Sequence, residues 1–401
     1  MFLKILNFSI VSLGRDTFHL CPWSGSSGKS KIAEVICSFH WKESLDYQGI
    51  DSRHQCEKQL KCLKDEFGFD LYSALEYEFV LMEGKHVSSQ KGKGENEGAE
   101  RKKLQPVFRG TDICSTFEHK KVEEFHIEVH RRLLSAGIIG RTYQVELGDA
   151  QNEITLPPAF GVRAGDEAFM LKSCVKETAW DVDKHASFMS KPFADGESES
   201  LVTNSGHFNH SLWDEHHNNV FYDPQNEHGF SKYQSIFMVA HWWAGGIMRH
   251  ARALCALVCP TANCYRRIVP GSWAPRKSGW ALDRRDAFIR CKNESKSGTY
   301  FECRTPSGAA NPYLVMAGIV AAGLDGLRNK VEPPPMGVSN EANSILLPKT
   351  LLEAVEEFER DTELNSMFGE EFTRWFCEGK RQTDCKVNTF EQERQKYWKL
   401  I

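Results

Sequence analysis

Residues 69–82 (FDLYSALEYEFVLM) place the strongest constraint on what this chain can fold into. Their aromatic and branched side chains predict a β-strand, and apolar residues on both alternating faces indicate burial on both sides. Glu76 and Glu78 lie two positions apart, so both carboxylates project from the same face. Two carboxylates about 7 Å apart repel each other unless a cation lies between them. The alternative is a pair of exposed acids on a solvated sheet face, which the apolar flanks disfavour.

Short strands and amphipathic helices surround this strand in the sequence. Apolar spacing predicts helices over 51–67, 118–134, 163–184, 231–257 (with Ser231 as the N-cap) and 311–328. Alternation predicts strands over 142–147, 152–156, 186–190 and 206–213, and short β-like runs within 1–45. Residues 84–104 lack periodicity and predict a flexible insertion, whereas three prolines at 333–335 precede a charged helical tail. Antiparallel strands with helices packed on one side define an α+β fold.

Composition narrows the classes of protein that the chain can belong to. A net charge of −4 on 401 residues favours neither nucleic acid nor an acidic membrane surface as a partner. Thirteen cysteines without a Cys-x-x-Cys pair indicate reduced thiols rather than a disulfide framework or a zinc site. Residues 1–13 could pass for a secretory leader, but Asn7 interrupts them and no small-residue cleavage site follows, so we expect a strand. The composition predicts a soluble, cytoplasmic protein.

The stretch from Thr261 to Tyr313 is rich in arginine among turn residues and aromatics. Its arginines are Arg266, Arg267, Arg284, Arg285 and Arg290, and Glu302 and Arg304 follow on one strand-like run. Guanidinium groups bind carboxylate and phosphate oxygens in two-pronged geometry, which predicts a pocket for a multiply anionic ligand. A solvated basic face paired with acids is the equally open alternative.

Further acids and one histidine lie at strand ends. Glu146 and Glu153 flank a tight hairpin, His207 begins a strand, and Glu302 begins the last strand. A lone histidine is more often a core or surface residue than a ligand. Oxygen-rich ligation with one imidazole suits Mg²⁺ or Mn²⁺ better than zinc.

Several of these segments resemble motifs of the class I glutamine synthetase family, in order and in spacing. They are NCYRRIVPG at 263–271, ECR at 302–304, ANPYL at 310–314, ELGDAQNE at 146–153 and HFNHSLW at 207–213. The resemblance covers nearly the whole chain from Asp16 onward.

The resemblance implies a glutamine synthetase fold, with a truncated N-terminal β-grasp domain over 1–48 and a catalytic-type domain over 49–401. It implies a homo-oligomer, a dodecamer of two stacked rings. It also implies a two-step reaction in which the side-chain carboxylate of glutamate takes the γ-phosphoryl group of ATP, and ammonia then displaces phosphate. Metals and arginines would neutralise the charge on the transferring phosphoryl group.

Carried over residue by residue, the resemblance implies these roles. Metal ligands fall on Glu76, Glu78, Glu146, Glu153, His207 and Glu302; ATP contacts on Asn209, Ser211, Arg285 and Arg290; and glutamate contacts on Arg267 and Arg304. His210 is the alternative to His207 as the ligand, because the preceding loop is one residue short of the family pattern.

The chain departs from the family at positions that matter for catalysis. Trp273 occupies the place of the flap glutamate that accepts a proton from ammonium, and indole cannot act as a base. Asn209 replaces the second histidine of a His-x-His pair, Asp286 lies beside the phosphate arginine, and Tyr300 replaces an arginine. The segment that carries the ammonium-site aspartate should lie upstream of Asp16, where we expect too few residues to hold it.

These departures lead to two interpretations. The first is a protein without glutamine synthetase activity, similar to a non-catalytic lens branch of the family. By that resemblance it would organise intermediate filaments, with vimentin and beaded-filament proteins as partners. The alternative is an ATP- and Mg-dependent glutamate–ammonia or glutamate–amine ligase, in which an apolar Trp273 wall suits a hydrophobic amine.

Overall fold

The computed structural model describes most of the chain. Its described residues are 2–6, 9–13, 17–20, 32–84, 105–110, 112–194, 196–197, 203–222, 238–293, 295, 297–337, 345–398 and 401. Ser231 and nearly all of the predicted insertion over 84–104 lie outside them. Within the described ranges, no helix is long and apolar enough to cross a bilayer.

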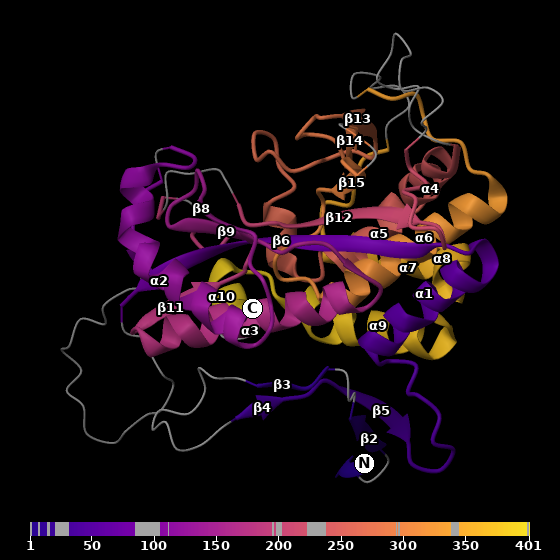
Figure 1. Cartoon of the computed structure of the whole chain (residues 1–401), viewed down its shortest axis with the longest axis horizontal. Helices are drawn as coiled ribbons and strands as arrows, with labels where there is room; N and C mark the ends of the chain where they lie inside the picture. Colours follow the sequence, from indigo (N-terminus) through magenta and orange to yellow (C-terminus); the bar gives the residue numbers. More distant parts are fainter. Residues whose placement is uncertain are drawn as a thin grey trace.

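A large sheet organises the molecule around its longest strand, β6 (Figure 1). The sheet order is β13 (Trp280–Leu282), β14 (Ile289–Asn293), β15 (Thr299–Cys303), β12 (Gly206–Trp213), β6 (Asp70–Glu83), β9 (Gln151–Thr155) and β8 (Thr142–Val145). Three short strands also pair with β6: β7 (Gln105–Pro106), β10 (Ala159–Phe160) and β11 (Lys184–Ser187). All of these pairings are antiparallel except that of β13 with β14. The predicted α+β fold is confirmed.

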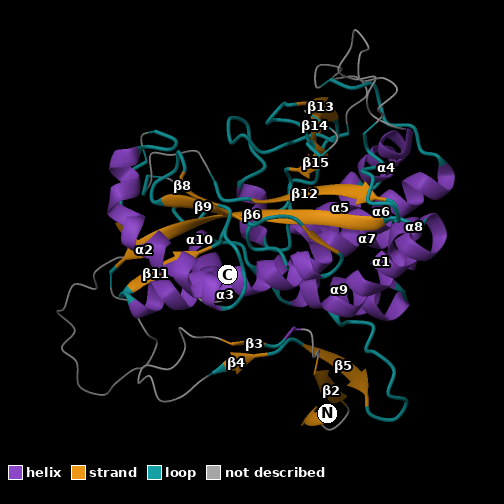
Figure 2. Cartoon of the chain, viewed as in Figure 1, coloured by secondary structure: helices purple, strands orange, loops and turns teal. Residues whose placement is uncertain are grey.

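Most helices lie on one side of this sheet, and β13–β15 continue the sheet beyond β12, at the top of the view (Figure 2). The helices are α1 (Ser52–Phe67), α2 (Thr116–Ser135), α3 (Arg163–Asp181), α4 (Met238–Arg249), α5 (Ala251–Val258), α6 (Pro312–Asn329), α7 (Leu351–Arg360), α8 (Thr362–Phe368), α9 (Glu370–Gln382) and α10 (Phe390–Tyr397), with short 3-10 turns at Ala262–Arg266 and Asp384–Lys386. The side chain of Asp51 caps α1 and that of Asn311 caps α6, with Pro312 in the first turn. Both helices therefore begin where the sequence predicts.

The N-terminal strands lie beyond the helices, away from the large sheet (Figure 1). β1 (Phe2–Leu6), β2 (Ser9–Leu13) and β5 (Cys37–Trp41) form one antiparallel sheet, and β3 (His19–Leu20) pairs with β4 (Ala33–Glu34). Residues 1–13 thus contain two paired strands rather than the single strand expected. That residues 1–48 form a domain separate from 49–401 stays a proposal.

Two predicted helices differ from the observed ones: one ends early and the other is divided in two. The helix predicted over 163–184 stops at Asp181, because Asp183 adopts a left-handed φ of 53° and β11 then pairs with β6. That pairing also places the predicted strand over 186–190 at Lys184–Ser187 instead. The single helix predicted over 231–257 is two helices, α4 and α5, that meet at His250. The ring nitrogens of His250 lie 3.1 Å from Asp325 Oδ2 and 2.7 Å from Asp361 Oδ2, which anchors the bend.

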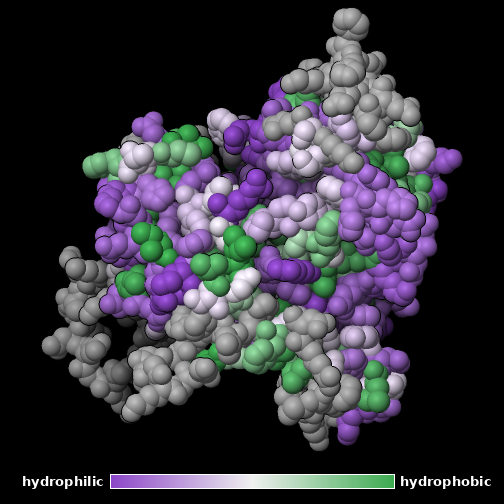
Figure 3. All heavy atoms as spheres, in the orientation of Figure 1, coloured by the Kyte–Doolittle hydropathy of each residue, from purple (hydrophilic) through white to green (hydrophobic). Residues whose placement is uncertain are grey.

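The described surface is largely hydrophilic, with small and separate hydrophobic patches in the view of Figure 3. The apolar side chains gather instead between the sheet and the helices, where Phe79, Phe208, Trp243 and Phe301 are fully buried. This core holds the large sheet rigid and so fixes the side chains on its opposite face.

Candidate active site

Strand register brings the predicted acids and His207 together. In the antiparallel pair of β6 and β12, Glu76 lies opposite His207. In the pair of β6 and β9, Glu78 lies opposite Glu153. Glu302 lies on β15, the next strand beyond β12. Four neighbouring strands therefore present these side chains at the middle of the sheet.

A cavity of about 620 Å³ opens over this part of the sheet. All six predicted metal ligands line it: Glu76, Glu78, Glu146, Glu153, His207 and Glu302. The predicted glutamate contacts Arg267 and Arg304, and the predicted phosphate contacts Arg285 and Arg290, line it as well. The site therefore combines a carboxylate cluster with a cluster of guanidinium groups.

His207 lies between two of the carboxylates. Its Nδ1 is 3.6 Å from Glu76 Oε2 and 3.5 Å from Glu302 Oε1. These separations exceed a hydrogen bond but allow one cation to contact all three side chains, whose ligand atoms lie within 4.8 Å of one another. The imidazole is only 4% exposed, and its Nε2 has no hydrogen-bond partner among the described residues. Burial, followed by the charges of Arg304 and Arg267, lowers the pKa of His207 well below its ordinary value, so the ring is neutral and able to ligate.

A second group of possible ligand atoms comprises Glu78, Glu153 and His207. Glu78 Oε2 accepts hydrogen bonds from the Ser205 backbone N–H at 2.7 Å and from Gln151 Nε2 at 3.1 Å. These contacts hold the Glu78 carboxylate in one orientation. His207 can therefore ligate one cation, either with Glu76 and Glu302 or with Glu78 and Glu153.

Gln144 links the two carboxylates of the hairpin. Its Nε2 donates to Glu146 Oε1 at 2.6 Å and to Glu153 Oε1 at 3.0 Å. Sequence reasoning missed Gln144, although it lies two positions before Glu146 and strand alternation could have identified it. Lys292, two positions after Arg290 on β14, also lines the cavity and was missed for the same reason.

Burial and mutual repulsion disfavour the charged forms of these carboxylates when no cation is bound. Burial and the neighbouring Glu302 raise the pKa of Glu76 to about 7, and burial with Glu78 raises that of Glu146 to about 7. Burial with Glu76 and Glu78 raises the pKa of Glu153 to about 10. Divalent cations would relieve this repulsion, and the oxygen-rich donor set with one imidazole fits Mg²⁺ or Mn²⁺.

The arginines divide into buried and exposed groups. Arg267 is 3% exposed and donates to the carbonyl oxygens of Thr305 at 2.9 Å and Arg304 at 2.7 Å. Arg304 contacts a carboxylate oxygen of Glu302 and donates to the Arg285 carbonyl at 2.6 Å. The interpretation of a solvated basic face is therefore wrong for these two buried residues.

Three further arginines pair with carboxylates. Arg290 donates to Glu302 Oε2 at 3.1 Å and to Asp283 Oδ1 at 2.7 Å. Arg284 is exposed and paired with Asp286, and Arg266 pairs with Glu393. The solvated, acid-paired interpretation holds for Arg284.

The two predicted nucleotide contacts on β12 do not line the cavity. Asn209 Nδ2 donates to Glu76 Oε1 at 2.8 Å, and Ser211 Oγ accepts from Trp213 Nε1 at 2.9 Å. Asn209 and Ser211 lie two and four positions after His207 on β12. Their side chains therefore project from the same face of the sheet as His207. Their role as ATP contacts stays a prediction.

His210 points away from the carboxylates. It accepts a hydrogen bond from Trp243 Nε1 at 2.9 Å, and its ring lies near those of Phe221 and Phe301 in the core. Its position three residues from His207 puts it on the opposite face of β12. Of the two histidines, only His207 lines the cavity, and its role as a metal ligand stays a prediction.

Trp273 lies at the edge of the cavity and is 59% exposed. Its backbone adopts a left-handed φ of 61°, which is rare for a bulky side chain. At the place where the resemblance implies a flap glutamate, the cavity has an indole wall.

The fold and the cavity together define an α+β protein with a carboxylate–histidine site for divalent cations beside arginines suited to an anionic substrate. The chain belongs to the glutamine synthetase family: the family model described as "Glutamine synthetase, catalytic domain" matches residues 49–398. Glutamine synthetase of Thermotoga maritima is 31% identical over 388 residues, which cover 94% of this chain and 81% of that protein.

Two further relatives carry names of amine ligases. Gamma-glutamylanilide synthase of an Acinetobacter species is 28% identical over 370 residues, covering 91% of this chain and 71% of that protein. Glutamate–isopropylamine ligase of a Pseudomonas species is 27% identical over 388 residues, covering 94% and 79%. A crystal structure of a glutamine synthase homologue matches the fold with a TM-score of 0.79 at 20% identity, over 98% of this chain and 85% of that chain.

Proposed function

We propose that this protein is an ATP-dependent ligase that joins the side-chain carboxylate of glutamate to an amine larger than ammonia. The single observation that carries this proposal is Trp273 at the edge of a cavity lined by all six predicted metal ligands. One relative named for an anilide product and another named for isopropylamine support it, because they are similar to this chain over most of its length.

The arginines would bind and orient the substrates. Arg267 and Arg304 would hold the α-carboxylate of glutamate, and Arg285 and Arg290 would contact the phosphates of ATP. Positioning two anionic substrates in this way supplies much of the rate in phosphoryl transfer. Mg²⁺ or Mn²⁺, held by Glu76, Glu78, Glu146, Glu153, His207 and Glu302, would neutralise charge on the phosphoryl group. The amine nitrogen would then attack the acyl carbon of γ-glutamyl phosphate, the bond from that carbon to the phosphate oxygen would break, and the departing phosphate would take up the amine proton.

Trp273 would decide which amine enters. Its indole offers no base for deprotonating ammonium, and loss of a positioned base costs about 10²- to 10⁴-fold in rate. It does offer an apolar surface against which an alkyl or aryl substituent can pack. A larger amine would therefore gain binding energy at the wall where ammonium gains none.

Phosphate release from ATP, measured with glutamate and one amine at a time, tests the proposal. We expect isopropylamine or aniline to stimulate release more than ammonium does. Trp273→Glu should shift the preference toward ammonium, whereas Trp375→Glu, a change at a 53% exposed tryptophan on α9, should not. Glu302→Gln should abolish release. If no amine in a broad panel stimulates glutamate-dependent release, the proposal is wrong.

A second candidate function is structural, and the loss of the base at Trp273 favours it. In this interpretation the chain resembles lengsin, the glutamine-synthetase-like protein of the vertebrate eye lens, and organises intermediate filaments such as vimentin and beaded filaments. Co-sedimentation of the pure protein with vimentin filaments tests it, and strong amine-dependent ligation would count against it.

We also infer a homo-oligomer, a dodecamer of two stacked rings, and a cytoplasmic location. The family resemblance implies the ring assembly, and sedimentation equilibrium of the pure protein tests it. The location is supported by the thiols, since none of the cysteines within the described ranges forms a disulfide.

A further inference from the structure

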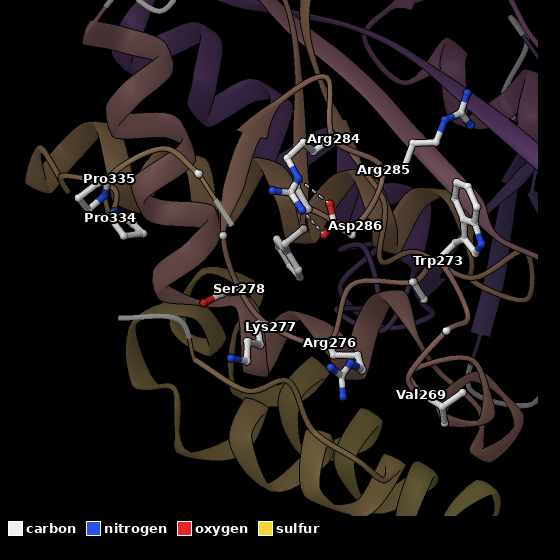
Figure 4. Close-up of a pocket in the computed structure, with 16 residues that line it drawn as sticks. Val269, Trp273, Arg276, Lys277, Ser278, Arg284, Arg285, Asp286, Pro334 and Pro335 are labelled. Atoms are coloured by element: carbon white, nitrogen blue, oxygen red, sulfur yellow. Dashed lines mark hydrogen bonds and ion pairs between the residues drawn. The ribbon is translucent and has the colours of Figure 1, made fainter. Parts of the chain in front are cut away.

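A second cavity of about 510 Å³ lies beside the candidate active site (Figure 4). Its volume is in the range of small-molecule pockets, about 300–1,000 Å³. In Figure 4, Arg284 and Asp286 lie on one side of the hollow, Arg276 and Lys277 on the opposite side, and Pro334 with Pro335 at one end. None of these six residues belongs to the predicted active site.

Backbone hydrogen bonds hold the walls of this cavity in place. The segment of Arg276 to Ser278 forms a β-bridge with the chain near Leu346: Leu347 N donates to the Arg276 carbonyl at 2.9 Å, and Ser278 N donates to the Ile345 carbonyl at 2.8 Å. On the proline side, Trp280 Nε1 donates to the Pro334 carbonyl at 2.8 Å. The hollow is therefore formed before any ligand arrives, which lowers the entropy cost of binding.

The charge on the cavity wall is unbalanced. Four lining residues are cationic, and Asp286 is the one carboxylate among the described lining residues. Asp286 is already engaged, because its two oxygens accept from Arg284 at 2.7 and 3.0 Å. The side chains of Arg276 and Lys277 form no hydrogen bond or ion pair with the described part of the chain. Two cations are thus left for an anionic partner.

The rest of the wall is apolar. Phe288 is nearly fully buried at the cavity, and Ala274, Ala287, Pro334 and Pro335 line it as well. Lysine and arginine side chains on an ordinary solvated surface do not border a concave apolar surface, whereas Arg276 and Lys277 do. The combination matches a ligand with an acidic end and a flat apolar body.

We propose that this cavity is a second ligand site, for a small molecule that carries a phosphate or carboxylate group on a flat apolar body. Arg276 and Lys277 bind the acidic group, and the apolar body lies against Phe288 and the prolines. Trp273 and Arg285 line both cavities, so a bound ligand also contacts the wall of the active site. This link to amine selection rests on the proposed function; the binding itself does not.

Titration calorimetry with phenyl phosphate tests the binding. EDTA is present throughout, so that the metal-dependent site is not loaded. We expect one saturable site per chain, binding of inorganic phosphate at least tenfold weaker, and no binding of phenol. Arg276→Gln with Lys277→Gln should weaken phenyl phosphate at least tenfold. The matched control is Lys61→Gln with Arg131→Gln, two exposed cations on α1 and α2, and it should leave the affinity unchanged.

Glu302→Gln distinguishes binding in the second cavity from binding in the active-site cavity, since Glu302 lines only the active-site cavity. It should leave phenyl phosphate binding intact. Binding that survives the Arg276/Lys277 double variant, that is lost in Glu302→Gln, or that is absent from the wild type would overturn the proposal. These outcomes do not depend on ligase activity, so a failure here is distinguishable from a failure of the proposed function.

Discussion

His207 faces Glu76 directly across the antiparallel pair of β12 and β6, and its Nδ1 lies 3.6 Å from Glu76 Oε2. Because strand register sets this relationship, it does not depend on a flexible loop. The neutral imidazole and the adjacent carboxylates form the part of the cavity best suited to a divalent cation.

Replacing His207 should weaken metal binding, whereas replacing His210 should not. His207→Ala removes the only imidazole in the described wall of the cavity, and we expect Mn²⁺ affinity to fall at least about tenfold by calorimetry. His210→Ala leaves Trp243 Nε1 unpaired in the core and should cost about 1–3 kcal/mol of stability in urea unfolding. Equal loss of metal affinity in both variants would contradict the assignment of His207.

The stability of the metal-free protein should fall as pH rises. The pKa values of Glu76 and Glu146, about 7, and of Glu153, about 10, exceed the ordinary value of 4.5. The folded state therefore binds these protons more tightly than the unfolded chain. This stabilisation is complete below pH 4.5 and is lost as pH rises through 7 and then toward 10.

Thermal melting in EDTA between pH 5.5 and 8.5 measures this effect. Glu153→Gln, which keeps the shape without the charge, should stabilise the metal-free protein at pH 8.5 by at least about 1 kcal/mol and flatten the pH profile. Mn²⁺ should reverse the order at pH 8.5, because the wild type binds it and the variant binds it less well. A metal-free melting temperature that rises from pH 5.5 to 8.5 would argue against crowded acids.

The left-handed backbone at Trp273 should store strain that glycine can release. Trp273→Gly and Trp273→Ala both remove the indole, but only glycine adopts a φ of 61° without a steric cost. We expect the glycine variant to be more stable than the alanine variant by about 1 kcal/mol in urea unfolding. Equal stabilities would mean that the backbone relaxes once the indole is gone.

The bend between α4 and α5 should respond to pH through His250. Burial alone would lower the pKa of His250, but hydrogen bonds and charge from Asp361 and Asp325 outweigh it and raise the value above 6.5. The resulting stabilisation is complete below pH 6.5 and is lost as pH rises through the raised pKa. His250→Gln should remove the part of the decline that His250 causes and leave the part that the active-site acids cause, while His216→Gln, at an exposed histidine, should leave the whole decline unchanged.

Local patterns in the sequence are enough to predict much of the site. Alternation placed Glu76 and Glu78 on one face of a buried strand, and apolar spacing placed the start of a helix at Asn311, whose side chain caps α6. The hairpin between Glu146 and Glu153 likewise needed only neighbouring residues. The six implied metal-ligand residues, carried over from motifs, all line one cavity.

Other features could not be predicted, because residues distant in the sequence determine them. The break of the long predicted helix at His250 depends on Asp325 and Asp361, which lie 75 and 111 residues further along the chain. The burial of Arg267 depends on carbonyl groups 37 and 38 residues away. The second cavity likewise joins residues 276–288 to residues 334–337.

The sequence by itself determined the α+β class, the family and the types of side chain at the site, because strand and helix periods and motif spacing are local properties. Tertiary structure alone decided which strands flank β6, that His207 rather than His210 faces the carboxylates, and that Trp273 borders two cavities. Strand pairing and burial arise from the packing of distant segments into one core. No short window of sequence contains that information.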